Sequence, residues 1–196
     1  REYRLYYVPV CWDVEPGYGL ALATSPDGIT WTKPNLGVVE WKGNKANNFV
    51  LWDQREGTVM IDPNAPAERR YGYLSSDGKL KTRLFTSPDG IHFTMHPDEI
   101  CSLHSDSQIS SFWDARLGKY FHFPRRVVND RRAVGVVTTD RMDQRWPPPD
   151  AIPVVMSGDD RDPPEVDLYT NAAQQYALAP NAYVAFPTPY YHHNLP

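Results

Sequence analysis

The sequence of 196 residues is poor in cysteine, with only Cys11 and Cys101, and their spacing does not decide whether they pair. No apolar run reaches the ~18 residues of a membrane-spanning helix, so we expect no membrane span. The formal net charge is −4 and the basic residues lie in scattered pairs, so the charge pattern typical of nucleic-acid binding is missing. Because HExxH, CxxC and glycine-rich phosphate loops are absent, we expect neither a metal nor a cofactor.

Helical periodicity is also missing, whereas aromatic residues and proline are frequent. Nine runs of four to eight residues have the composition and alternation of strands. They cover residues 3–8, 19–24, 49–52, 71–74, 80–86, 109–113, 120–123, 133–138 and 183–186. The sequence therefore predicts an all-β chain of short, evenly spaced strands.

Two motifs recur with a period near sixty residues. The run Thr24 to Ile29 returns 62 positions later as Thr86 to Ile91, both reading Thr-Ser-Pro-Asp-Gly-Ile. A Trp-Asp pair at Trp52 returns 61 positions later at Trp113. Two unrelated motifs that move in step indicate repeated units of one supersecondary type.

A fainter third copy aligns residues 107–124 with residues 170–187, which places Tyr120 on Tyr183. The repeat divides the chain into units of about 1–44, 45–104, 105–166 and 167–196. Within each unit we expect a strand, a Trp-Asp turn, a strand that ends in proline, a further strand, and a Ser-Pro-Asp-Gly turn. In that turn proline fixes φ, aspartate bonds its own backbone and glycine adopts positive φ.

Four antiparallel strands per unit are typical of a β-propeller blade, and a β-sandwich, the rival fold, does not predict a sixty-residue repeat. We therefore predict a β-propeller with an incomplete ring of about three and a quarter blades. The first unit lacks an opening strand and the fourth stops after about two strands. We expect either a piece of a longer propeller or self-association through the open blade edges.

The first strand of each blade lines a propeller's central channel, and the repeat places three amides at one such position, Asn47, Gln108 and Asn171. Amides donate and accept hydrogen bonds, which suits sugar hydroxyls. The alternative is that these amides bond to backbone groups or water.

Two carboxylates stand out against the repeat. Asp106 enters the third unit's first strand where the other units carry Lys45 and Tyr169, and it is the best candidate for an acid or base, with a turn-capping role as the alternative. Asp62 replaces an apolar repeat position, or it ends a strand before proline. Glu165 and Asp167 are further carboxylates, and we expect a solvated acidic loop there.

Several segments together resemble one family. They are Tyr3 to Tyr7, the first Ser-Pro-Asp-Gly segment followed by Asn47-Asn48, Asp62 to Asn64, the second Ser-Pro-Asp-Gly segment, Asp106 to Gln108 with Phe112 to Asp114, and Tyr169 to Asn171. The likeness is to bacterial proteins related to the five-bladed propeller glycosidases, the arabinanase, xylosidase and invertase group. It implies a carbohydrate-active protein that uses carboxylates from successive blades, and it slightly favours an extracellular or periplasmic location.

This resemblance implies the roles of individual residues. Asp106 would act as the general acid and Asp62 as the carboxylate that orients substrate and stabilises charge. The groups expected to bind hydroxyls are Asn47, Asn48, Gln108, Arg125, Tyr169 and Asn171. Such a carboxylate pair hydrolyses glycosidic bonds when the two environments drive the pKa values apart.

Two other functions stay open at this point. A propeller that binds a carbohydrate or a protein without catalysis would use the same funnel, because one fold hosts many functions. A sialidase-type protein is the third hypothesis, although its Asp-box turns carry a further residue between Asp and Gly.

Overall fold

The computed structural model of the chain describes residues 2–54, 57–77, 81–103, 105, 108–163 and 166–192. The described residues form an all-β protein of several antiparallel sheets, none closed into a barrel. Two short 3₁₀ segments, Ala67–Arg69 and Pro149–Ala151, are the helical elements of this part of the chain. None of its helical segments is long or apolar enough to cross a membrane.

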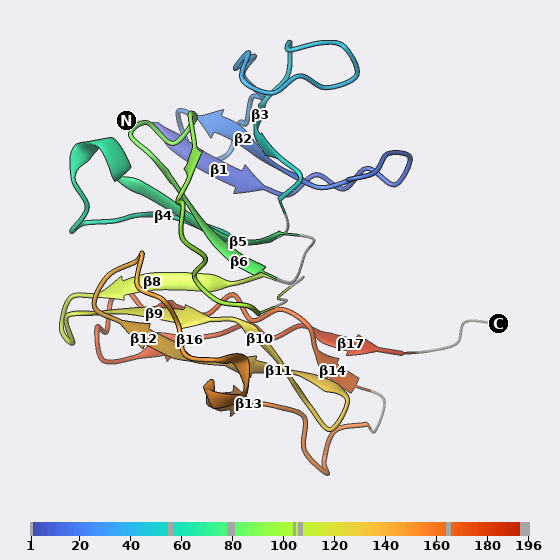
Figure 1. Cartoon of the computed structure of the whole chain (residues 1–196), viewed down its shortest axis with the longest axis vertical. Coiled ribbons are helices and arrows are strands. Elements are labelled where there is room, and N and C mark those ends of the chain that lie inside the picture. The colour runs from blue at the N-terminus through green and yellow to red at the C-terminus, as the bar shows by residue number, and fades with distance from the viewer. Residues whose placement is uncertain are drawn as a thin grey trace.

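The first two sheets contain strands β1 to β7 (Figure 1). A three-stranded sheet has the order β1-β2-β3, and a four-stranded sheet has the order β4-β5-β6-β7. The strands are β1 Tyr3–Tyr7, β2 Gly19–Ser25, β3 Phe49–Trp52, β4 Thr58–Ile61, β5 Tyr71–Asp77, β6 Lys81–Ser87 and β7 Thr94–Met95.

The third region contains β8 Ser110–Asp114, β9 Lys119–Phe123, β10 Arg125–Val128, β11 Arg131–Gly135, β12 Val137–Thr139 and β13 Val154–Met156. Its two three-stranded sheets have the orders β12-β9-β8 and β10-β11-β13. Only Pro124 separates β9 from β10, and only Val136 separates β11 from β12. Because β9 pairs with β12 and β10 pairs with β11, the region follows one antiparallel course of four successive strands.

The last region contains two pairs of strands. Strands β14 Val166–Leu168 and β17 Pro189–Tyr191 form one pair, and β15 Gln174–Gln175 and β16 Tyr183–Val184 form the other. Strand β15 lies beside β8, and β14 lies beside β11, so this region packs on the third one.

The expectation of an all-β chain is confirmed, and each of the nine runs overlaps a strand or a strand pair, namely β1, β2, β3, β5, β6, β8, β9, β11 with β12, and β16. The nine runs do not include β4, β7, β10, β13, β14, β15 and β17. Where a strand alternates, the reason is that one of its faces is buried between sheets. In β6, for example, Thr82 and Leu84 are buried, whereas Lys81 and Arg83 are partly exposed.

The two Ser-Pro-Asp-Gly turns are built alike, as the repeat predicts. In the second turn the Ser87 hydroxyl donates to Asp89 Oδ1 at 2.9 Å and accepts from the Gly90 N–H at 2.9 Å. Asp89 Oδ1 also accepts the backbone N–H groups of Ile91 and His92. Gly90 has a φ of 76°, which is the left-handed conformation that favours glycine.

The two Trp-Asp segments are not equivalent in the sheets. After Trp113 the chain forms the hairpin β8-β9, in which Asp114 accepts the N–H groups of the turn. After Trp52 the chain passes from β3, which pairs with β2, to β4, which pairs with β5. The expectation that β3 and β4 form consecutive strands of one sheet is therefore wrong, and the end of β4 corresponds in space to the end of β8.

Apolar side chains fill the spaces between successive sheets. One cluster, centred on Leu22, Tyr73 and Phe85, lies between the first sheet and the second. Another, centred on Leu74, Leu84 and Tyr120, lies between the second sheet and the third region. Figure 1 shows the sheet of β1–β3 above that of β4–β6, with β8–β13 below.

Candidate functional site

Asp62 lies just after β4, and its carboxylate is mostly buried, with 8% of the residue exposed. The Tyr120 hydroxyl, at the start of β9 in the neighbouring sheet, donates a hydrogen bond to Asp62 Oδ1. The Asn64 N–H donates to the same oxygen at 2.9 Å, and the Asn64 side-chain amide donates to the Tyr120 hydroxyl at 3.0 Å. The three groups form a closed hydrogen-bonded triad that joins two sheets.

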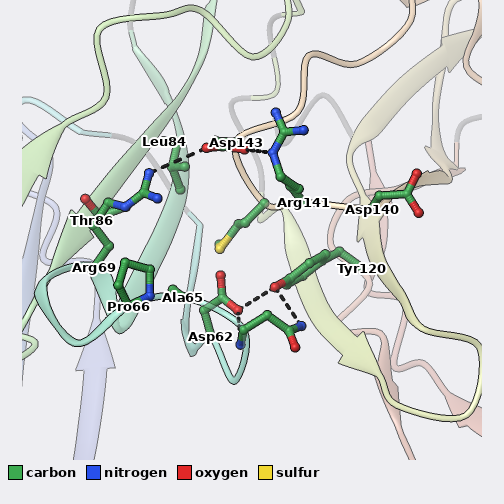
Figure 2. Close-up of a pocket in the computed structure, with 12 residues that line it drawn as sticks. Asp62, Ala65, Pro66, Arg69, Leu84, Thr86, Tyr120, Asp140, Arg141 and Asp143 are labelled. Carbon is green, nitrogen blue, oxygen red and sulfur yellow. Dashed lines mark hydrogen bonds and ion pairs between the residues drawn. The ribbon is translucent and has the colours of Figure 1, made fainter.

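A pocket of about 100 Å³ opens beside this triad (Figure 2). Its lining comes from the segment after β4, from β6, from β9 and from the segment after β12. The residues are Asp62, Asn64, Ala65, Pro66, Arg69, Leu84, Thr86, Tyr120, Asp140, Arg141, Met142 and Asp143. Figure 2 shows the second oxygen of Asp62 turned away from Tyr120 toward the middle of the pocket.

The charged residues that line the rest of the pocket, Arg69, Asp140, Arg141 and Asp143, form ion pairs; we call this part of the pocket the rim. Asp143 lies 2.8 Å from Arg141 Nε and 3.5 Å from Arg69 Nη1. Lys119 Nζ lies 2.5 Å from Asp140 Oδ1. These pairs are largely exposed and contribute little to stability, but they leave the pocket close to neutral and dense in donors and acceptors.

Tyr120 is held in its protonated form. Burial of the phenol and its hydrogen bond to the Asp62 carboxylate raise the pKa of Tyr120 to about 12. Its ring packs on Trp113 with centroids 4.6 Å apart, so the hydroxyl has a fixed direction. Because the phenol keeps its proton up to a pH near 12 and its position is fixed, Tyr120 donates a hydrogen bond to Asp62 at neutral pH.

The same arrangement recurs one repeat later. Asp114 is the last residue of β8, whereas Asp62 is the first residue after β4. Asp114 accepts a hydrogen bond from Tyr183, the residue that the repeat aligns with Tyr120. Burial alone would raise the pKa of Asp114, but Tyr183 and two backbone N–H groups hold it below its ordinary value. Asp62 and Asp114 are thus equivalent members of a repeated aspartate–tyrosine contact between neighbouring sheets.

Three of the amides predicted to bind sugar donate hydrogen bonds to other groups of the protein. Asn47 donates to Val39 O at 2.8 Å, and Asn48 donates to Leu22 O at 2.8 Å and to the Tyr7 hydroxyl at 2.9 Å. Asn171 is buried and donates to Phe123 O at 3.2 Å. For Asn47 and Asn171, the alternative stated from the sequence, a bond to the backbone, describes the observed contacts.

The remaining candidates are spread over the molecule. Asp106 and Glu165 lie outside the described residues. Gln108 adjoins Ile109, which pairs in parallel with Gly57 at the start of β4, whereas Asp62 lies five residues farther along, roughly 16 Å away at strand spacing. Gln108 and Asp62 are therefore at opposite ends of neighbouring strands.

Arg125 and Tyr169 do not line the Asp62 pocket either. The Arg125 N–H donates to the Ser105 hydroxyl at 3.1 Å. The Tyr169 ring lies under the guanidinium of Arg132, 5.1 Å from its centroid.

The expectation of a solvated acidic loop is wrong for Asp167. The residue lies in β14 and is buried, and its Oδ2 is 2.7 Å from Arg132 Nη1 and 2.8 Å from His192 Nε2. Burial raises the pKa of Asp167, but the bonds to His192 and Arg132 outweigh burial and lower it. This carboxylate joins β11 to the strand pair β14-β17.

His122 is a buried residue that bonds to two hydroxyl groups of the protein. His122 is fully buried between the Ser111 hydroxyl at 3.0 Å and the Thr139 hydroxyl at 3.1 Å, and burial lowers the pKa of His122 to about 3. A base this weak does not activate a serine. Within the described ranges, no group of three or more His, Cys, Asp or Glu side chains could hold a metal ion, and both cysteines are free thiols.

Reasoning from the sequence missed Tyr120, Asn64 and Asp143. Tyr120 carried a signal in its alignment with Tyr183, because both tyrosines contact an aspartate of the preceding sheet. Asn64 carried one as part of the Asp62 to Asn64 segment of the resemblance. Comparisons of the chain with protein-family models, curated proteins and solved structures gave no match.

Proposed function

We propose that the successive sheets are blades of a β-propeller of the glycosidase-like type. Support comes from the order β4-β5-β6-β7 and the four-strand course of β8–β13, each an antiparallel meander. Strands β4 and β8 begin side by side and in parallel at Gly57 and Ile109, as the innermost strands of neighbouring blades do. The repeated aspartate–tyrosine contact joins these units in the same sense each time.

Within this fold, the function that we propose is carbohydrate binding at the Asp62 pocket. The observation that carries it is the free oxygen of Asp62: no described residue bonds to Oδ2, although Oδ1 is fully engaged. A fixed carboxylate oxygen accepts hydrogen bonds from sugar hydroxyls, and Asn64 and the rim guanidinium groups supply donors.

The volume of the pocket limits the size of the ligand group that it can bind. Sites for whole small ligands have volumes of about 300–1,000 Å³. A pocket of about 100 Å³ holds one edge of a sugar ring or a hydroxymethyl group, and the rest of the glycan lies outside. We therefore propose a site that recognises one sugar unit of a longer, neutral glycan.

Hydrolysis of the bound glycan is the second candidate. Asp140 and Asp143 line the same pocket as Asp62, so carboxylates from neighbouring units flank one space. In this version Asp106 would be the acid and Asp62 the orienting carboxylate.

Calorimetric titration with neutral oligosaccharides tests the binding proposal. We expect saturable binding that Asp62→Asn weakens at least about tenfold, a loss typical of a charged hydrogen bond. Asp98→Asn, the same change on an exposed aspartate, is the control and should leave affinity unchanged. Equal affinity of the wild type and Asp62→Asn, or no saturation by any glycan, would refute the proposal.

Release of reducing ends from the same glycans tests hydrolysis separately. Turnover that Asp106→Asn abolishes without weakening binding would support the catalytic version. Turnover that this variant leaves unchanged would remove Asp106 from the mechanism, while the binding proposal would stand on its own titration.

A further inference from the structure

The first sheet has an edge at β1 that no strand among the described residues pairs with. The repeat identifies the counterpart of β1 as β5, because Tyr3 pairs with Ser25 as Tyr71 pairs with Ser87, and both serines open a Ser-Pro-Asp-Gly turn. Strand β5, however, has β4 along its second edge. The position beside β1 that corresponds to β4 is thus unpaired in this part of the chain.

The backbone groups on this edge point outward. Thr24 and Thr32 exchange two backbone hydrogen bonds of 2.9 Å, so the N–H and C=O of Thr24 point away from β1. Arg4 is the antiparallel partner of Thr24, and its own N–H and C=O therefore point away from β2. The same holds two residues on, at Tyr6, so Arg4 and Tyr6 present two donors and two acceptors to an incoming strand.

The second sheet provides the template for this pairing. Counting from the tyrosine that pairs with the turn serine, Gly72 corresponds to Arg4 and Leu74 to Tyr6. In the second sheet Gly72 pairs with Met60, and Leu74 pairs with Thr58. The incoming strand would take the place of β4, antiparallel to β1.

A cleft of about 570 Å³ lies where this strand would run. One wall is β1 and the other is β4, and the lining residues are Glu2, Tyr3, Arg4, Tyr6, Val59, Met60, Ile61 and Tyr71. The walls carry exposed apolar groups: Ile61 is 53% exposed and Tyr3 is 41% exposed. Leu5 is 46% exposed, whereas Tyr73, its counterpart in β5, is fully buried.

We propose that this cleft binds an extended polypeptide strand with the chemistry of β4, that is, a short run of mainly β-branched and apolar residues. The strand pairs with β1 through Arg4 and Tyr6 and runs parallel to β4, as β4 runs parallel to β8 at Gly57 and Ile109. Strand addition gains affinity from main-chain hydrogen bonds and specificity from alternate side chains. The side chain opposite Arg4 faces β4 and must be apolar, as Met60 is in the second sheet.

A labelled peptide tests this inference directly. It carries the β4 sequence Thr-Val-Met-Ile between lysine flanks, and fluorescence anisotropy follows its binding to the whole chain. Methylation of the Thr and Met amides, which face β1 in the proposed register, should weaken binding at least about tenfold. Methylation of the Val and Ile amides, which face away from β1, is the matched control and should change binding less than about threefold.

Variants of the protein complete the test. Ile61→Lys places a charge in the cleft and should abolish peptide binding, whereas Val155→Lys, on a strand residue that is also 53% exposed, should not. Absence of saturable binding, or equal affinity of the two methylated peptides, would overturn the proposal. A concentration-dependent dimer that Ile61→Lys dissociates would also overturn it, because a second copy of the chain would then occupy the cleft.

Discussion

Replacement of Tyr120 by phenylalanine isolates the contact on which the candidate site depends. The phenyl ring of this variant would keep its packing on Trp113, while Asp62 would lose the hydroxyl that donates to its Oδ1. Asp62 is 8% exposed, so water cannot fully replace the lost donor. We therefore expect Tyr120→Phe to destabilise the fold rather than to leave it unchanged.

The magnitude follows from the strength of the lost hydrogen bond. A hydrogen bond to a charged group contributes about 1.5–3 kcal/mol. Burial is the first cause of the raised pKa of Tyr120 and the bond to Asp62 the second, so the shift sets the pH dependence of the loss and not its size. We therefore expect a loss of about 1.5–3 kcal/mol, or roughly 3–12 °C in melting temperature for a chain of this size.

The pKa shift also fixes the pH dependence and its sign. The folded-state pKa lies above the unfolded value, so the stabilisation is complete below pH 10 and is lost as pH rises toward about 12. At pH 11 the unfolded tyrosine is largely ionised, and about half of the difference between wild type and Tyr120→Phe should be gone.

Urea unfolding at pH 8, 10 and 11 measures this difference. Tyr176→Phe is the control, because Tyr176 is exposed and its hydroxyl contacts no described residue; its effect should stay within about 0.5 kcal/mol. A double-mutant cycle with Asp62→Asn should assign most of the loss to the pair. A Tyr120→Phe variant as stable as wild type at pH 8, or a stability difference that does not shrink from pH 10 to 11, would refute the reasoning.

Three further predictions concern the repeated turns and buried groups. Gly90→Ala should prevent folding or lower the melting temperature strongly, because a Cβ at this position would overlap the Tyr6 hydroxyl. Gly118 also has a positive φ but has open space around it, so Gly118→Ala should lower the free energy of unfolding by only about 1 kcal/mol, measured in urea. Between pH 6.5 and 4.5 the unfolded chain protonates His122, whereas the folded chain, in which the pKa of His122 is about 3, does not, so the wild type loses stability as the pH falls. His122→Gln should remove this part of the pH dependence. Tyr183→Phe should lower the urea midpoint, since buried Asp114 would lose a donor.

Local structure could be predicted from the sequence because its causes are local. Strand composition and alternation gave the nine strands, and the Ser-Pro-Asp-Gly motif gave turns in which Ser87 and Asp89 make the same bonds as Ser25 and Asp27. These elements depend on residues within a few positions of one another, which is the range over which turn chemistry acts.

The pairing of strands could not be predicted in the same way. Trp52 and Trp113 have similar neighbours, yet β3 joins the sheet of β2, whereas β8 begins a hairpin with β9. Which neighbour a strand pairs with depends on the packing of whole sheets, and a one-residue change of register moves every side chain to the other face. The partner of Asn171, Phe123 O, could not be read from the repeat for this reason, because it lies 48 residues away in strand β9.

The repeated aspartate–tyrosine contact changes how Asp62 must be understood. A carboxylate at an apolar repeat position suggested catalysis, but Asp114, its spatial equivalent, is fully buried and bonds Tyr183 together with the backbone of its own turn. The contact therefore arises from the way neighbouring sheets are joined, and it would be retained whether or not a ligand binds. What distinguishes Asp62 is the second oxygen, which faces a pocket in one repeat, while that of Asp114 is engaged by Tyr183. A ligand that recognises Asp62 must therefore do so through Oδ2.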